Sequence, residues 1–598
     1  MKLSTLSLLF AAVGGLSGCS GGGGDSTPPP PPPPPPSVGS ITLAGVVAKG
    51  AALANASVAA TCATGTGTAT TGANGSYSLS ITGGALPCVL KATSSDNLTR
   101  LHSVAPAGSS TSVTANVTPL TELVVAQLTG KEPAAYVASV VIGTLGSVAT
   151  ASAVAAAQTS LASTLAAGGV SSSTAGDFIS GALVAANGTS TGNAYDLVLD
   201  ALNARLVAAG TTLAALTRNI ADGAAPPPAP GTPPTTSDVA SLPADLLLKP
   251  KAANCASLAS GSYRLIRFAA SPGSTVTAVE TFNFDAPTLT FSNGNPADTF
   301  TMTPNGNCRF SIGTDADIVV SPAGVMVARA FIGSNDDTVA VPARGTTRMI
   351  VMLPVQTIAV ADLAGTWNLI GWERNGTYGE SGTIVTVAST GAVTQAKCDE
   401  LATPETACPS STTGLPVFSA NSAGGFNLTS TDPQDLYTDR VYAYRAGNGD
   451  LMAVALSSDG DLAFLTKVRT LTLPAVGPVT TNWNVDLRVT GLASDPLYYR
   501  THTVASVNTT AGSLVRNTSN DAGTVTVPQT LEYNKARNGY LHRPAATTAA
   551  SDGSAATVRE IWALPLRGFG MTVVYVPATS GTGTSSNALF ELSIAKQP

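Results

Sequence analysis

The chain has few charged, aromatic and histidine side chains, and each shortage excludes a class of function. Of its 598 residues, 30 are Lys or Arg and 36 are Asp or Glu, which gives a formal net charge of −6. A nucleic-acid-binding protein needs clustered cations to contact phosphates, so we expect no nucleic-acid partner. Aromatic residues make up only 5% of the chain, so its cores must be built from small and β-branched side chains.

Histidine is too rare for a His-based metal site, since only His102, His502 and His542 occur. All three stand in polar surroundings, and we interpret them as surface residues rather than members of a catalytic triad. The sequence has no dinucleotide-binding, phosphate-loop or zinc-protease motif. The Gly-x-Ser-x-Gly string at residues 18–22 overlaps a cleavage signal and so cannot position a nucleophile. We therefore expect no cofactor, no metal and no catalytic residue.

The amino terminus carries an export pattern. Lys2 precedes an apolar run over residues 3–13, too short to span a bilayer, and Leu-Ser-Gly-Cys follows at residues 16–19. This motif resembles the lipobox of bacterial lipoproteins. The resemblance implies that residues 1–18 are a signal peptide, that Cys19 is acylated, and that Ser20 directs the protein to the outer membrane of a Gram-negative cell. An ordinary signal peptide with a chance cysteine is the alternative.

Residues 19–40 form the expected anchor and tether. Four glycines at residues 21–24 give flexibility, and nine prolines at residues 28–36 predict a stiff polyproline helix rising about 3.1 Å per residue. A second proline-rich linker is expected at residues 224–237, where six prolines lie between positions 226 and 234.

The cysteines indicate an oxidising compartment. Six remain beside Cys19, and the linkers divide them into three local couples with two cysteines in each module. Zinc ligation is the alternative, but no C-x-x-C pair exists. We therefore predict three disulfides: Cys62 with Cys88, Cys255 with Cys308, and Cys398 with Cys408.

Residues 41–117 alternate between apolar and polar side chains in short runs separated by Gly and Asn turns, which predicts β-strands. The segments at residues 45–47, 53–58 and 71–79 resemble the carboxypeptidase regulatory-like, prealbumin-type β-sandwich. Within the last segment, Asn-Gly predicts a tight turn, and the Tyr and Leu that follow are expected to point into the core. The resemblance implies a non-catalytic module.

Residues 118–223 read as a small helical bundle. Thr118 is a suitable N-cap, Pro119 fits the first turn, and residues 174–177 form a second capping-box pattern. Residues 133–176 carry no charge, but they are rich in Ala, Ser, Thr and Gly, so we favour packed helices over a membrane span. One amphipathic stripe comprises Leu199, Leu202, Leu206, Ala209, Leu213 and Leu216. Gly223, which precedes the prolines, is the expected end of the helical region.

The remainder reads as three tandem β units, because a strand opening recurs at residues 261–265, 365–369 and 481–485. A hydrophobic hairpin containing Met follows each opening. The Gly-x-Trp opening with Trp367 resembles lipocalin-like barrels, which implies a Trp that plugs one end and contacts an apolar ligand. One large propeller is the structural alternative. The predicted β ranges are 238–356, 357–474 and 475–598.

Several clusters of acids and tyrosines are candidate sites. Paired acids hydrolyse glycosides or bind calcium, yet Asp and Gly between apolar strands are also what hairpin turns require, and we prefer turns. These acids are Asp336, Asp337, Asp432, Asp435, Asp439, Asp459 and Asp461. Five tyrosines could stack on a sugar, but we prefer core packing: Tyr437, Tyr442, Tyr444, Tyr498 and Tyr499.

The sequence thus predicts a multi-domain, mainly β protein: a β-sandwich, one helical region, and tandem antiparallel barrels or sandwiches. We expect a non-catalytic binding or scaffolding lipoprotein of the cell envelope. Its expected partners are the membrane, through the lipid anchor, and an envelope protein, a glycan or an apolar small molecule. Two alternatives remain open: a lipocalin-like carrier of an apolar ligand, and a secreted hydrolase with a carboxylate site in the C-terminal half.

Overall fold

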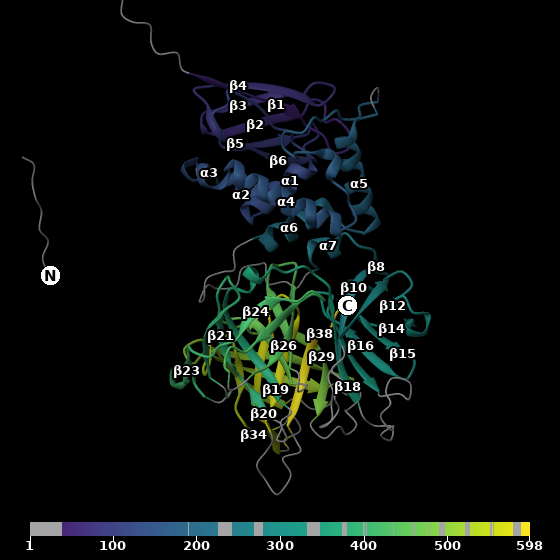
Figure 1. Cartoon of the computed structure of the whole chain (residues 1–598), viewed down its shortest axis with the longest axis vertical. Coiled ribbons are helices and arrows are strands. Elements are labelled where there is room, and N and C mark those ends of the chain that lie inside the picture. Colours follow the sequence, from purple (N-terminus) through teal and green to yellow (C-terminus); the bar gives the residue numbers. More distant parts are fainter. Residues whose placement is uncertain are drawn as a thin grey trace, which may run out of the picture. The chain divides into compact units, whose positions relative to one another are not determined.

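The computed structural model (Figure 1) is mainly β with one helical region, as the sequence predicted. It describes residues 39–140, 142–188, 191–224, 242–267, 279–331, 347–373, 379–398, 401, 403–433, 436–457, 461–477, 479–488, 497–520, 527–549, 553, 555–577 and 588–598. The predicted signal peptide, Cys19, both proline-rich segments, and the acids Asp336, Asp337, Asp435 and Asp459 lie outside these residues.

Two sheets of mostly antiparallel strands form residues 40–114. One has the strand order β4-β1-β7 and the other the order β3-β2-β5-β6. The strands are β1 (Ser40–Val46), β2 (Ser57–Thr64), β3 (Thr66–Thr70), β4 (Ser76–Thr82), β5 (Ala85–Thr93), β6 (Arg100–Ala105) and β7 (Ser112–Thr114).

Strand β4 illustrates why this segment folds as predicted. Tyr77, Leu79 and Ile81 are buried while the serines between them are exposed, because successive side chains point to opposite faces. The turn before β4 places Gly75 at φ 76°, a left-handed conformation that glycine adopts without strain. The Tyr77 hydroxyl donates to the carbonyl of Ala115 at 2.5 Å, which ties the strand to the end of the sandwich.

The helical region begins where the sequence predicted. Thr118 caps α1, its side chain accepting a hydrogen bond from the Thr121 amide, and Pro119 stands in the first turn. The helices are α1 (Pro119–Thr129), α2 (Pro133–Ala138), α3 (Ile142–Val148), α4 (Ala151–Ala167), α5 (Ala194–Ala208), α6 (Leu213–Ala224) and α7 (Ala244–Leu247).

Two details of the helical prediction were wrong. No α-helix starts at residues 174–177, because the Asp177 carboxylate accepts from the amides of Ile179 and Ser180 and closes a turn instead. The leucine stripe is divided between α5 and α6, which meet at 95° near Gly210. Within the described residues, no single helix is long and apolar enough to cross a bilayer; only this bent pair meets the length and composition criteria.

The sandwich and the helices share one hydrophobic core. It joins Leu43 and Leu90 of the sheets to Leu123 of α1, Leu161 of α4 and Leu199 of α5. The β-sandwich of residues 41–117 and the helices of residues 118–223 therefore bury their apolar faces against each other. Their division into two separate domains stays a prediction.

Three further sheets follow, and we call them the first β unit, the second β unit and the third barrel. The first β unit has nine strands: β10 (Gly261–Arg267), β11 (Val279–Asp285), β12 (Thr290–Ser292), β13 (Phe300–Thr301), β14 (Thr303–Gly306), β15 (Arg309–Ile312), β16 (Ala316–Val320), β17 (Met326–Phe331) and β18 (Thr347–Pro354). The second has ten: β19 (Gly365–Glu373), β20 (Gly379–Ser381), β21 (Ile384–Val387), β22 (Val393–Lys397), β23 (Ser410–Ser411), β24 (Val417–Ala420), β25 (Phe426–Thr429), β26 (Thr438–Arg445), β27 (Leu451–Leu456) and β28 (Leu462–Lys467).

The third barrel is closed. Its eight strands are β29 (Val479–Arg488), β30 (Tyr498–Asn508), β31 (Ser513–Asn520), β32 (Val527–Tyr533), β33 (Leu541–Arg543), β36 (Ile561–Leu566), β37 (Met571–Val576) and β38 (Leu589–Ala595). A separate hairpin of β34 (Ala546–Ala549) and β35 (Ala555–Val558) interrupts the sequence between β33 and β36.

All three sheets follow one circuit, in which the strand carrying the recurrent opening pairs with the last strand of its own sheet. These pairs are β10 with β18, β19 with β28, and β29 with β38. Among the described strands, a continuous ladder closes the third sheet, whereas β13 does not pair with β14 in the first β unit. In the second β unit, an isolated antiparallel bridge between Ala392 and Val417 joins the start of β22 to β24. The arrangement corrects the propeller alternative and agrees with the predicted tandem antiparallel barrels or sandwiches.

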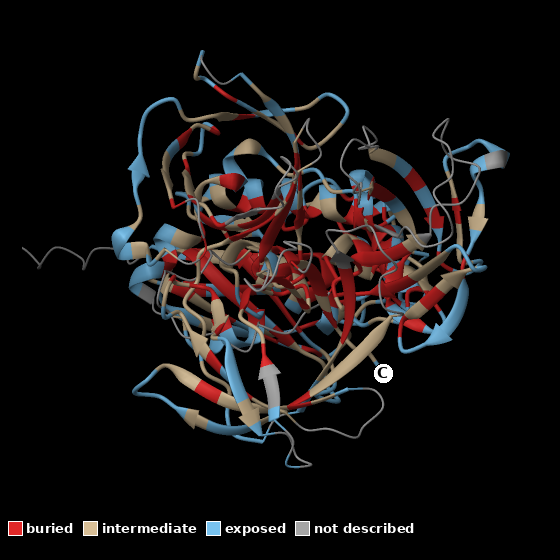
Figure 2. Ribbon diagram, turned by 90° about the horizontal axis from the view of Figure 1, so that it is seen from below, coloured by how far each residue is buried: buried red, intermediate tan, exposed pale blue. Residues whose placement is uncertain are grey.

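The three sheets pack around a common core rather than hanging as separate beads. Trp372 of the second β unit lies 5.8 Å from Phe590 of the third barrel, ring centroid to ring centroid, and Phe464 stacks on the same ring at 6.0 Å. Val327 of the first β unit belongs to the same buried cluster. Figure 2 shows the buried residues concentrated in the inner strands, with exposed residues on the outer turns.

Candidate functional site

The third barrel carries a group of buried polar side chains, namely Asp486, His502, Thr518, Gln529, Arg543 and Glu591. Alternation along the strands sends one set of side chains outward into the shared core and the other set inward. On β38, Phe590 and Leu592 pack outward while Glu591 lines an internal cavity. The same alternation places Arg500 and His502 on the inner side of β30, and this inner side forms the candidate site.

Arginines dominate one wall of this interior. Arg516 donates from Nε to the Gln529 side chain at 3.1 Å, and Arg543 donates from Nε to the Arg559 carbonyl at 3.0 Å. No ion pair within the described part of the chain includes Arg516 or Arg543. The hydrogen bonds that Arg516 and Arg543 donate from Nε thus go to neutral acceptors.

Burial and mutual repulsion weaken the charges of these arginines. Burial, reinforced by Arg516 and Arg500, lowers the pKa of Arg543 to about 9. Burial also lowers the pKa of Arg516 to about 10. Both groups remain protonated at neutral pH, so the interior holds positive charge at an electrostatic cost.

Two carboxylates lie in the same interior and share one tyrosine. The Tyr498 hydroxyl donates to Glu591 at 2.9 Å and approaches Asp486 at 3.3 Å. Asp486 and Glu591 are direct partners on the neighbouring strands β29 and β38, so they belong to one wall of the barrel. Burial, followed by these two negative charges, raises the pKa of Tyr498 far above its ordinary value.

His502 and Thr518 form a hydrogen-bonded pair at 2.9 Å beside the arginines. Burial first, then Arg516, Arg500 and Arg543, lowers the pKa of His502 to about 2. A general base works best when its pKa is near the operating pH, so this imidazole would be a weak base for activating Thr518. The pair suits a structural or binding role better than nucleophilic catalysis.

A cavity of about 360 Å³ lies in this interior. Strands β30 to β33 supply most of its polar lining, including Arg500 and Arg543, whereas β36 to β38 supply mostly aliphatic side chains together with Glu591. The aliphatic lining consists of Val527, Val558, Ile561, Val574, Val576 and Leu589. The cavity can thus contact a polar group on one side and an apolar group on the other.

Trp367 lies in the interior of the second β unit and is 3% exposed. Its indole Nε1 donates to the Leu363 carbonyl at 2.7 Å. The apolar space beside it, bounded in part by Phe418 and Val441, measures only about 10 Å³. Such a space is no larger than one water molecule, so the structure has no preformed ligand cavity beside Trp367 among the described residues. Ligand binding by Trp367 stays a prediction.

The prediction of disulfides is confirmed, and the structure contains the pairs Cys62–Cys88, Cys255–Cys308 and Cys398–Cys408. The first joins directly opposed residues on β2 and β5. The third closes a short loop that receives a segment of the third barrel.

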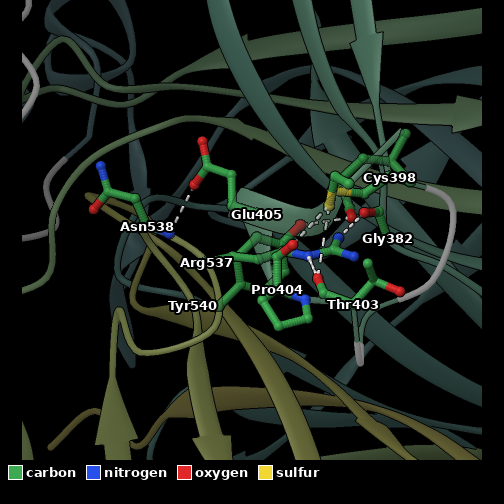
Figure 3. Close-up of a disulfide and its surroundings, with 10 residues drawn as sticks. Gly382, Cys398, Thr403, Pro404, Glu405, Arg537, Asn538 and Tyr540 are labelled. Atoms are coloured by element: carbon green, nitrogen blue, oxygen red, sulfur yellow. Dashed lines mark hydrogen bonds between the residues drawn. A yellow bond between two sulfur atoms is a disulfide. The ribbon is translucent and has the colours of Figure 1, made fainter. Parts of the chain in front are cut away.

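Figure 3 shows that segment, in which Arg537 points toward Gly382 and Thr403 beside the third disulfide. Its guanidinium donates to the carbonyl oxygens of both residues, and the side chain is 1% exposed. The nearby Tyr540 hydroxyl donates to the Leu369 carbonyl at 2.8 Å. A loop of the third barrel is therefore held by the second β unit.

The other polar residues singled out in the sequence do not assemble into one site. Ser457 and Asp461 exchange two hydrogen bonds between β27 and β28, which agrees with the preferred hairpin turn. The described residues contain no group of three or more His, Cys, Asp or Glu side chains able to hold a metal ion. Tyr498 and Tyr499 point to opposite faces of β30, so the five tyrosines do not form one sugar-stacking surface.

The interpretation of the histidines as surface residues was wrong for two of them. His102 is 2% exposed and bonds Glu122 of α1 at 2.9 Å, and His502 is 8% exposed inside the third barrel. Sequence reasoning also missed the arginine wall, since charged residues alternating with Thr on β30 and β31 read as a solvent face. Only closure of the sheet turns that face inward.

No protein-family model matches the chain, and no curated protein matches it. Among solved structures, transferrin binding protein B from Neisseria meningitidis serogroup B aligns over 57% of this chain and 77% of its own, with 10% identity and a TM-score of 0.18. Transferrin binding protein B from Haemophilus parasuis aligns over 56% and 75%, with 9% identity and a TM-score of 0.16. Scores this low carry no argument about the fold or the function of this chain.

Proposed function

We propose that the chain is an exported, lipid-anchored protein of the bacterial envelope whose role is binding rather than catalysis. The observation that carries the proposal is the two-walled cavity of the third barrel, with a volume of about 360 Å³. Small-molecule sites combine apolar side chains with placed polar groups, and the lining of this cavity contains both kinds.

Export and anchoring are supported by the lipobox-like residues 16–19 and by the three disulfides, since disulfides persist in oxidising compartments. Acylation of Cys19 would hold the protein on a membrane, because several acyl chains together give stable attachment. We place it at the outer membrane of a Gram-negative cell, where its partner is an envelope protein, a glycan or a small molecule.

Replacing the acylated thiol tests the attachment. In cells, Cys19→Ser should move the protein from the membrane fraction to the soluble fraction, whereas the neighbouring control Ser20→Ala should leave it attached. Mass spectrometry of the wild-type amino terminus should find an acylated cysteine. Wild-type protein that retains Met1 and stays in the cytosol would contradict the proposal.

The carrier alternative has less support in the second β unit than in the third barrel. The space beside Trp367 is about 10 Å³, so a ligand there would have to displace packed side chains. An apolar ligand fits better in the larger cavity, although the arginines of that cavity favour a charged group.

One observation keeps a hydrolase as the second candidate: Asp486 and Glu591 lie together in the interior of the third barrel. Glycosidases need two carboxyl groups on either side of the scissile bond. Here both lie on one wall and share Tyr498, which favours binding. Turnover of chromogenic glycosides that is lost in Glu591→Gln, while stability is retained, would reverse this preference.

A further inference from the structure

We propose that the cavity of the third barrel binds a small organic anion, with a carboxylate or phosphate head group on the arginine wall and a short apolar part on the aliphatic wall. The inference rests on the proposed binding function and names the class of ligand. It is carried by the charges, the burial and the shape of one cavity.

Charge is the first argument. Three arginines line the cavity among the described residues, namely Arg500, Arg543 and Arg559, and the only carboxylate lining it there is Glu591. Arg516 and Asp486 lie just beyond this lining and add one charge of each sign. The cavity therefore has an excess of positive charge that an anion would neutralise.

Burial is the second argument. Arg543 is 6% exposed, and the hydrogen bond in the described structure uses only its Nε, on the Arg559 carbonyl. A guanidinium has five N–H donors in a planar fork, which matches the two oxygens of a carboxylate or phosphate. Burial, reinforced by Arg516 and Arg500, lowers the pKa of Arg543, and a bound anion would oppose that shift by favouring the charged form.

Shape is the third argument. Ile561 of β36 and Val574 of β37 lie across the interior from β30 and β31, the strands that carry Arg500 and Thr518. A ligand that touches both walls must be amphipathic. The volume of about 360 Å³ is near the lower end for small-molecule sites, so its apolar part must be short.

Calorimetric titration and thermal unfolding of the full chain carrying Cys19→Ser test the inference. Hexanoate and hexyl phosphate should bind and raise the unfolding temperature. Hexanol has the same tail without charge, and acetate has the charge without the tail, so both should bind at least tenfold more weakly. The stronger of the two anions identifies the head group.

Variants of the cavity locate the binding. Arg543→Gln should weaken anion binding at least tenfold, because it removes a charge-assisted pair. Val574→Asp places a carboxylate against the arginines and should abolish binding in a folded protein. Arg218→Gln is the matched control, since Arg218 is an exposed residue of α6 paired with Glu132. If Arg543→Gln fails to fold, Arg500→Gln serves in its place.

Two results would overturn the inference: no binding of either anion at about millimolar concentration, or binding that Arg500→Gln and Val574→Asp leave unchanged. Neither result bears on attachment through Cys19, because fractionation of the cells measures that independently. If the wild-type protein fractionates with the membrane but neither anion binds, the proposed function stands and only the proposed ligand class is wrong.

Discussion

A buried histidine makes the stability of this protein depend on pH. His502 has its pKa lowered to about 2 from an ordinary value of 6.5, with burial as the largest cause and three arginines adding to it. Below pH 6.5 the His502 side chain binds a proton in the unfolded chain but not in the folded chain, so acid favours unfolding. The effect grows by about 1.4 kcal/mol per pH unit.

Urea unfolding at pH 7 and pH 4 measures this contribution. Wild-type protein should lose about 3 kcal/mol more than His502→Asn over that interval, because Asn can bond Thr518 without taking up a proton. Other groups titrate in both proteins and cancel in the difference. Equal losses in the two proteins would mean that His502 is protonated in the folded state.

At the scale of elements, the third disulfide supports the contact between the second β unit and the third barrel. The loop closed by Cys398 and Cys408 carries Thr403, whose carbonyl accepts from Arg537, and the Glu405 amide donates to the Ala536 carbonyl at 3.0 Å. Cross-linking a loop of 10 residues restricts the unfolded chain by about 2 to 3 kcal/mol.

Removing this bridge should loosen both partners. The double variant Cys398→Ser with Cys408→Ser should unfold at lower denaturant concentration and exchange amide hydrogens faster in residues 403–408 and 534–540. The matched double variant of Cys62 and Cys88 should be destabilised without changing exchange in those two segments, since it joins β2 to β5. Unchanged exchange in the first variant would show that Arg537 is held without the bridge.

At the scale of the whole molecule, the shared core predicts that the C-terminal sheets unfold together. Phe590 is fully buried between Trp372 and Phe464 of the second β unit. Truncating a buried Phe to Ala typically costs about 3 to 5 kcal/mol. Because its neighbours Trp372 and Phe464 belong to another sheet, the substitution should lower the stability of both the second β unit and the third barrel.

Hydrogen exchange of Phe590→Ala tests this coupling. Exchange should accelerate in β19 and β28 as well as in the third barrel. Phe291→Ala is the control, since Phe291 belongs to the separate interior cluster of the first β unit, and its effect should centre there. Acceleration confined to the third barrel would indicate that the sheets fold independently.

The sequence by itself determined what depends on local chemistry. Alternation in β4, the Thr118 cap, the Asn-Gly turn and the recurring strand openings are properties of a few neighbouring residues, and the fold class followed from them. The capping-box pattern at residues 174–177 failed because the Asp177 side chain bonded to nearby amides in a turn.

Only the tertiary structure decided which faces of the strands are interior. Arg500 and Arg543 lie 43 positions apart and look like solvent-facing residues until the eight strands close and turn them toward one cavity. In the same way, Arg537 finds its partners on another sheet, more than a hundred residues away. Closure and packing join residues that no local pattern connects, and the candidate site exists only through them.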